Sequence, residues 1–141
     1  MLPDAPAPTA ILEAALYVDD LDAAEDFYGT LIGLPRIQRI GNRHVFFRVG
    51  IGTLLIFNTT ETLKPTRNPR FPVPPHGAVD AGHFCFAQPR EGMDQMRIRL
   101  IAAGVSIESE FDWPNGMHSI YFRDPAGNSI EIAEPHLWSD E

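Results

Sequence analysis

Glu131 is the residue whose position in the sequence most needs a chemical explanation. It lies in the run YFRDPAGNSIEI, residues 121–132, where an alternating strand stops at Asp124-Pro125, turns, and restarts. Proline and glycine account for the turn. They do not account for Glu131, because a charge on a core-facing strand is costly unless another group pairs with it or a metal binds it.

A glutamate and a histidine occupy comparable places in two other apolar segments. Strand side chains alternate between faces, so Glu13 and Tyr17 share one face of the segment 11–18. In the next module, His83 and Cys85 share the face opposite two phenylalanines. On both strands we expect the ionisable side chain to point away from the residues that pack on the helix.

The elements that carry these residues occur twice along the chain. Each half predicts a strand, a helix and three more strands, with helix ends at Gly33 and Gly104. In the first half the strands are predicted at 11–18, Arg36–Ile40, Arg43–Val49 and Thr53–Asn58. In the second half they are predicted at His83–Ala87, Val105–Phe111, Met117–Arg123 and Ser129–Ala133. The predicted fold class is α+β, with two tandem βαβββ modules.

Five segments follow from this pattern. They are an N-terminal tail at 1–10, a first module at 11–58, a Pro-rich connecting loop at 59–80, a second module at 81–135 and a C-terminal tail at 136–141. The loop contains five prolines and several basic residues, and long loops of this kind are linkers, lids or functional loops. It is either a plain connector or a basic flap that favours anionic substrates.

Composition limits the class of partner. The chain has 141 residues, 44% of them apolar, and a net charge of −8. No basic cluster and no membrane-length apolar stretch is present, so neither nucleic acid nor a membrane is expected as a partner. The single cysteine rules out an intrachain disulfide and predicts a cytoplasmic protein. We expect a small-molecule substrate.

The two modules and three motifs resemble the vicinal oxygen chelate superfamily. The motifs are the opening VDDLDAAEDFYGTLIGL, the strand GHFCFA and the closing YFRDPAGNSIEI, and the resemblance covers residues 10–135. This superfamily includes the glyoxalase I, fosfomycin-resistance, extradiol dioxygenase and bleomycin-resistance families. The resemblance implies a cleft between the modules with a divalent metal at its floor, held by the first and fourth strands of each module.

The resemblance assigns ligand positions to Glu13, His83 and Glu131. Aligning Gly52 with Gly127 puts Ile56 at the fourth position, and isoleucine cannot bind a metal. One imidazole and two carboxylates suit a first-row divalent ion with open positions, such as zinc, nickel, manganese or iron. No organic cofactor is expected. Glu13 is either a ligand, a general base or an exposed residue paired with a cation.

Two further residues are candidate catalytic groups. Tyr121 shares a strand face with Ser119, and a matching tyrosine in fosfomycin-resistance proteins touches the ligand; the alternative is a core aromatic residue. His44 is the first-module counterpart of Ser119 and lines the cleft or is an exposed histidine. Cys85 is expected to be a small filler, because no adjacent base would activate it.

Three functions remain open at this point. The first is a metal-dependent lyase or isomerase of glyoxalase type, in which a substrate chelates the metal through two adjacent oxygens and a carboxylate moves the proton. The second is an extradiol-type dioxygenase with Fe(II), although that class uses two histidines. The third is a metal-free drug-binding protein of bleomycin-resistance type. The resemblance also implies a homodimer.

Overall fold

The chain alternates strands and helices in two similar series in the computed structural model, which describes residues 1–66 and 68–139. The first series is β1 (Glu13–Val18), α1 (Leu21–Glu25), the π-helix η1 (Asp26–Leu31), β2 (Arg36–Ile40), β3 (His44–Val49), β4 (Gly52–Asn58) and α2 (Thr59–Thr62). The second series is β5 (His83–Ala87), α3 (Arg90–Ala102), β6 (Ser109–Asp112), β7 (His118–Arg123) and β8 (Ser129–Ala133).

Each series forms its own four-stranded sheet. The strand order is β1-β4-β3-β2 in the first sheet and β5-β8-β7-β6 in the second. In both sheets the first strand of the module is parallel to the fourth, and the other pairs are antiparallel. This repeat confirms the predicted α+β fold built from two βαβββ modules.

The helices begin and end where the sequence supplies caps. The Asp20 side chain accepts a hydrogen bond from the Ala23 amide and caps α1. Gly33 and Gly104 follow the helices with φ of 90° and 81°, a left-handed conformation that favours glycine. The described helices include none long and apolar enough to cross a membrane.

Three elements differ from the sequence prediction. The first helix is not continuous, because its second half widens into η1. The strand predicted at Val105–Phe111 begins only at Ser109, since Val105 and Ile107 pack against the core before the ladder starts. The connecting segment starts with a helix, α2, whose first turn is capped by Asn58.

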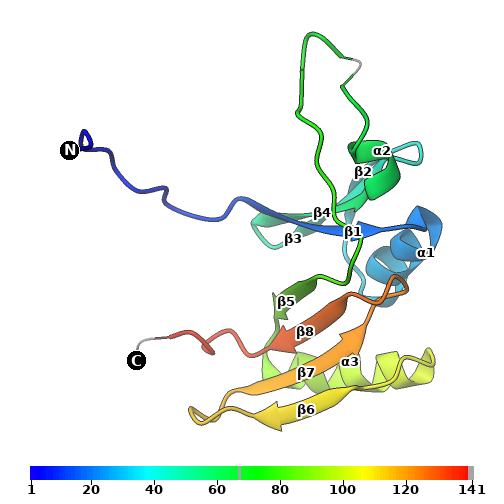
Figure 1. The fold of residues 1–141 in the computed structure, drawn as a ribbon. Coiled ribbons are helices and arrows are strands. Elements are labelled where there is room, and N and C mark those ends of the chain that lie inside the picture. The colour runs from blue at the N-terminus through cyan, green and yellow to red at the C-terminus, as the bar shows by residue number, and fades with distance from the viewer. Residues whose placement is uncertain (67, 140–141) are drawn as a thin grey trace.

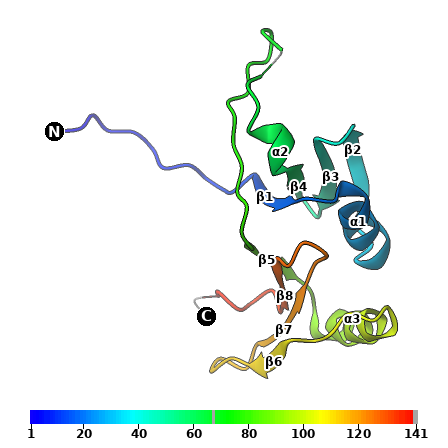
Figure 2. The same ribbon diagram turned by 45° about the vertical axis from the view of Figure 1, so that its right-hand side comes forward.

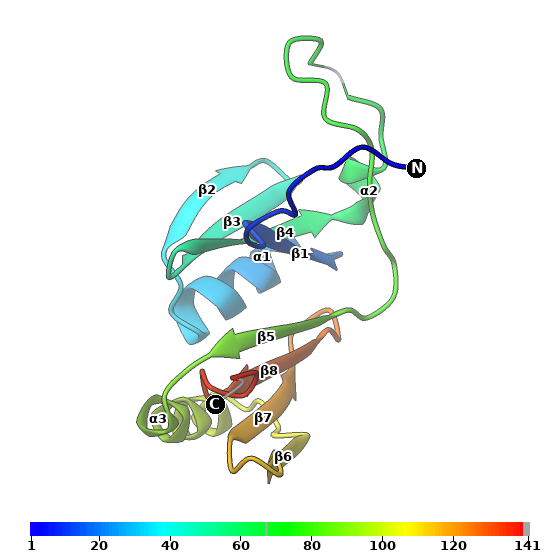
Figure 3. The same ribbon diagram turned by 90° about the vertical axis from the view of Figure 1, so that its left-hand side faces the viewer.

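One apolar core joins the two modules. Its buried residues come from both sheets and from the helices, and the rings of Phe27 and Phe122 meet across the module boundary at 6.1 Å. Figures 2 and 3 show the two sheets one above the other, with α1 on the side of the first sheet that faces the second module. The helix-bearing face of each sheet is therefore buried.

Two segments extend away from this core. The N-terminal residues before β1 are exposed and carry no secondary structure. The Pro-rich segment after α2 projects as an arm before the chain returns to β5 (Figure 1). The arm returns to the first sheet at His76, whose ring lies 4.6 Å from that of Phe57.

A buried carboxylate links the modules at the turn before β8. Asp124 is 4% exposed and accepts hydrogen bonds from Tyr28 Oη at 2.7 Å, from the amides of Ala126 and Asn128, and from Asn128 Nδ2. Asn128 Nδ2 also donates to the Tyr17 carbonyl at 3.1 Å. The closing motif of the second module is thus attached to both η1 and β1 of the first.

A histidine on β7 shares two carboxylates of the edge strand β6 with arginines of α3. His118 places its ring nitrogens 2.7 Å from Asp112 and 2.8 Å from Glu110. Arg97 and Arg90 of α3 pair with the same two carboxylates. Burial lowers the pKa of His118, but hydrogen bonds to Glu110 and Asp112 outweigh burial and hold the pKa above its usual 6.5.

Replacing Tyr28 with phenylalanine should destabilise the fold. The substitution removes the hydroxyl that Asp124 accepts from and leaves a buried carboxylate one donor short. We expect the free energy of unfolding to fall by about 1.5–3 kcal/mol, the range for hydrogen bonds to charged groups. Urea denaturation measures the change. Tyr17→Phe, which removes a part-buried hydrogen bond to a histidine, is the control and should cost about 1 kcal/mol or less.

The stabilising effect of His118 should depend on pH. Because its folded pKa lies above 6.5, the protonated ring stabilises the fold fully below about pH 6.5, and this contribution is lost as pH rises through the folded pKa. We expect His118→Gln to cost about 1 kcal/mol near pH 6 and progressively less at higher pH. Unfolding curves at several pH values test this, with exposed His136→Gln as the control. A cost that grows with pH would contradict the assignment.

Candidate metal site on the open faces of the sheets

The face of the second sheet that bears no helix gathers most of the predicted site. Strand register pairs Glu131 with Cys85 of β5 and with Tyr121 of β7, so these side chains lie on one face. His83 lies on the same face, two residues before Cys85, and Ser119 lies two residues before Tyr121. The alternation predicted from the sequence is confirmed on these strands.

Glu131 is a buried carboxylate with polar partners on both of its oxygens. Its exposed fraction is 5%. Ser119 Oγ donates to Oε2 at 2.6 Å, and His83 Nε2 lies 3.3 Å from Oε1. These contacts explain how an apolar strand tolerates the charge.

The backbone fixes the orientation of His83. Its Nδ1 lies 3.0 Å from the Ser129 carbonyl oxygen. A carbonyl only accepts, so Nδ1 carries a proton and the neutral ring presents a lone pair at Nε2. That lone pair faces Oε1 of Glu131, and either a second proton on the ring or a cation between the two atoms satisfies both. A histidine anchored through its other nitrogen is the usual arrangement of a metal ligand, so the pair fits a divalent metal.

Two neighbours of Glu131 remain protonated at neutral pH. Burial, followed by the charge of Glu131, raises the pKa of the Cys85 thiol to about 12. Burial, followed by a hydrogen bond with Glu131 and by the charge of Glu131, raises the pKa of Tyr121 to about 12. Cys85 is therefore no nucleophile, and Tyr121 is a neutral hydrogen-bond donor beside the carboxylate.

Glu13 lies on the first sheet instead. It lines a cavity of about 550 Å³ on the open face of that sheet, together with His44 of β3. No group of three His, Cys, Asp or Glu side chains close enough to hold a metal occurs in the described ranges. Within one chain, the structure joins His83 with Glu131 and does not add Glu13 to them.

The first-sheet counterpart of Glu131 is Leu55, and the placement of Ile56 at that position was wrong. In the second sheet Glu131 pairs with Cys85, two residues after His83. In the first sheet Ala15, two residues after Glu13, pairs with Leu55. Ile56 pairs with Leu16 and is fully buried in the core. Leucine is also unable to bind a metal, so the position stays without a donor.

His44 does occupy the place in the first sheet that Ser119 holds in the second. His44 pairs with Phe57 two positions beyond Leu55, as Ser119 pairs with Ala133 two positions beyond Glu131. Burial and the charge of Arg43 lower the pKa of His44 to about 4. The ring is neutral at pH 7, and Arg43 donates to its Nδ1 at 2.7 Å. His44 thus offers an N–H at Nε2 and is unsuited to be a general acid near neutral pH.

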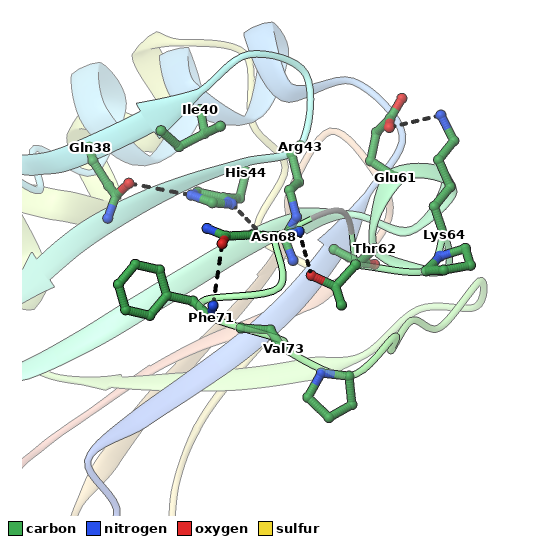
Figure 4. Close-up of a pocket in the computed structure, with 13 residues that line it drawn as sticks. Gln38, Ile40, Arg43, His44, Glu61, Thr62, Lys64, Asn68, Phe71 and Val73 are labelled. Carbon is green, nitrogen blue, oxygen red and sulfur yellow. Dashed lines mark hydrogen bonds and ion pairs between the residues drawn. The ribbon is translucent and has the colours of Figure 1, made fainter.

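A larger groove continues from this cavity beneath the Pro-rich arm. Its volume is about 900 Å³. One wall is formed by His44 of β3 and the preceding Arg43, and the other wall by the arm residues Lys64, Asn68 and Phe71 (Figure 4). The arm thus supplies one wall of a cavity beside the candidate site. Basic, amide and aromatic side chains line it together with Glu61, which pairs with Lys64 at 2.9 Å.

Sequence reasoning left two contributors without a role. Trp113 Nε1 donates to Ser119 Oγ at 2.8 Å, and no pattern in the sequence indicates this contact. His76, in the Pro-rich segment, places Nδ1 2.6 Å from the hydroxyl of Tyr17, on the strand that carries Glu13. Its signal was weak because a histidine that follows two prolines in an irregular segment has no periodic neighbours.

Similar proteins share both the sequence pattern and the fold. The sequence profile of the Glyoxalase/Bleomycin resistance protein/Dioxygenase superfamily matches residues 10–132. An uncharacterized protein of Pseudomonas aeruginosa is 32% identical over 129 residues, covering 84% of each chain.

Solved structures give the same result. A crystal structure named lactoylglutathione lyase, from Agrobacterium tumefaciens, is 44% identical with a TM-score of 0.85, covering 96% of this chain and 100% of that one. A glyoxalase/dioxygenase from Nostoc punctiforme is 22% identical with a TM-score of 0.66, covering 94% and 97%, and shares the fold. With its two βαβββ modules and a profile match over most of its length, the chain belongs to the Glyoxalase/Bleomycin resistance protein/Dioxygenase superfamily.

Proposed function

We propose that this protein is a metal-dependent lyase or isomerase of glyoxalase type. The observation that carries the proposal is the pairing of His83 Nε2 with Glu131 Oε1 at 3.3 Å, with His83 anchored through its other nitrogen. The 44% identity to a structure named lactoylglutathione lyase supports the same class of reaction. The substrate we infer is a small molecule with two adjacent oxygens.

The proposed roles divide between the two open faces. His83 and Glu131 hold a divalent ion, whose identity among zinc, nickel, manganese and iron stays open. When bound, such an ion supplies a Lewis acid that polarises the substrate oxygens. Tyr121 donates a hydrogen bond that orients the substrate, since its raised pKa keeps the phenol neutral. Glu13 is the third ligand or the base that moves the proton.

A homodimer would complete this site. Glu13 belongs to the open face of the first sheet, and the His83–Glu131 pair belongs to the open face of the second. If two chains pack so that these faces oppose each other, Glu13 of one chain reaches the pair of the other, and both open faces become covered. A two-fold dimer of this kind contains two equivalent sites.

The first sheet would then contact the substrate. His44 is neutral and presents Nε2–H, so it orients a substrate oxygen and leaves proton transfer to a carboxylate. Arg43 lines the groove under the arm and suits an anionic group of the substrate, whereas Lys64 is paired with Glu61 at 2.9 Å. We place this chemistry in the cytoplasm because of the single cysteine.

Metal binding should depend on Glu131. We expect protein purified without chelators to bind about one divalent ion per proposed site, and Glu131→Gln to weaken binding at least about tenfold, because an amide is a poorer metal ligand. Equilibrium dialysis followed by elemental analysis measures both. Glu91→Gln, at an exposed position in the first turn of α3, is the matched control and should bind like the wild type. Absence of stoichiometric metal in the wild type would refute the proposed function.

Two inactive variants should restore each other if the site is shared. Glu13→Gln and Glu131→Gln would each damage every site of their own homodimer. In a mixed dimer one site carries both substitutions and the other carries neither. After subunit exchange of equal amounts, we expect about a quarter of wild-type sites to reappear, from random pairing in a two-fold dimer. Metal content and lyase activity of the mixture measure this; no recovery in exchanged dimers would place the site within one chain.

A further inference from the structure

A chain of hydrogen bonds reaches the oxygen of Glu131 that faces away from His83. Trp113 Nε1 donates to Ser119 Oγ at 2.8 Å, and Ser119 Oγ donates to Glu131 Oε2 at 2.6 Å. Ser119 is fully buried. An indole N–H can only donate, and a serine hydroxyl has one proton. Because Ser119 accepts from Trp113, its own proton is directed to Glu131.

The backbone fixes the facing histidine in the same way. The Ser129 carbonyl engages Nδ1 of His83 at 3.0 Å. As a result, Nδ1 of His83 and Oε2 of Glu131 each have a partner within the protein. The two remaining atoms, Nε2 of His83 and Oε1 of Glu131, are the ones that face each other at 3.3 Å.

We infer that Trp113 and Ser119 are positioning residues for Glu131. They occupy Oε2, so that the carboxylate presents a single oxygen, Oε1, beside His83. The inference rests on the proposed function in one respect, namely that the group contacted by Oε1 is a divalent cation. Without this pair a carboxylate can rotate and engage a cation through either or both oxygens, which weakens a site designed for one. Partners of this kind, one step removed from the metal, typically change affinity by 10- to 100-fold.

The first measurement needs no metal. The chain has two tryptophans, and Trp138 is 89% exposed, so Trp138→Phe leaves Trp113 as the single indole N–H in a ¹H–¹⁵N spectrum. In that background we expect Ser119→Ala to move the Trp113 indole resonance. Glu131→Gln should move it too, through the intervening hydroxyl. Ser109→Ala, on exposed β6 of the same sheet, is the matched control and should leave it in place.

The second measurement is the affinity for zinc, by competition with a chromophoric chelator. Ser119→Ala and Trp113→Phe should each weaken binding by about 10- to 100-fold, whereas Ser119→Thr, which keeps the hydroxyl, should restore most of the affinity. Trp113→Phe keeps an aromatic ring and removes the N–H together with the five-membered half of the indole. Circular dichroism verifies that the variants are folded.

The two measurements separate the possible failures. If the wild type binds no zinc, the proposed function fails, while an indole shift in Glu131→Gln still supports the hydrogen-bond chain from Trp113 through Ser119 to Glu131. If the wild type binds zinc and both Ser119→Ala and Trp113→Phe bind it equally well, the positioning role is overturned and the proposed function stands. If the Trp113 indole resonance does not move in Glu131→Gln, the positioning role is overturned as well.

Discussion

The buried carboxylate of Asp124 is the constraint on which the rest of the structure depends. It gathers donors from its own turn and the hydroxyl of Tyr28 from the other module. Leaving a buried charged group without one of its donors costs more free energy than a typical hydrogen bond contributes. Each partner must therefore be in place. The two modules are therefore held in one relative position by a group that tolerates little displacement.

The same turn sets the geometry of the candidate site. Asn128, held by Asp124, accepts a hydrogen bond from the Gly82 amide at 2.8 Å, and Ser129 N donates to the Gly82 carbonyl at 2.9 Å. These contacts fix the parallel register of β5 on β8. A shift of one residue would turn His83 or Glu131 to the other face. The pairing of His83 with Glu131 is thus a consequence of the turn.

The sequence predicted the repeated modules and the face of each candidate residue, because alternation and helix-stop glycines are local signals. It misplaced the fourth ligand position, since anchoring on turn glycines ignores that the two turns differ in length. Register with the parallel strand, which assigns Leu55, is a tertiary property. Trp113 escaped prediction for a similar reason: it lies in the turn between β6 and β7, and its direction depends on how that turn closes.

The duplication has a consequence for how the protein can change. Leu55 and Glu131 occupy matching positions in the two halves, and so do His44 and Ser119, yet each pair has diverged completely in chemistry. A duplicated gene segment allows one copy to vary while the other is preserved. The fold therefore repeats where the site does not, and a substrate bound between the two kinds of face would meet a different set of donors and acceptors on each side.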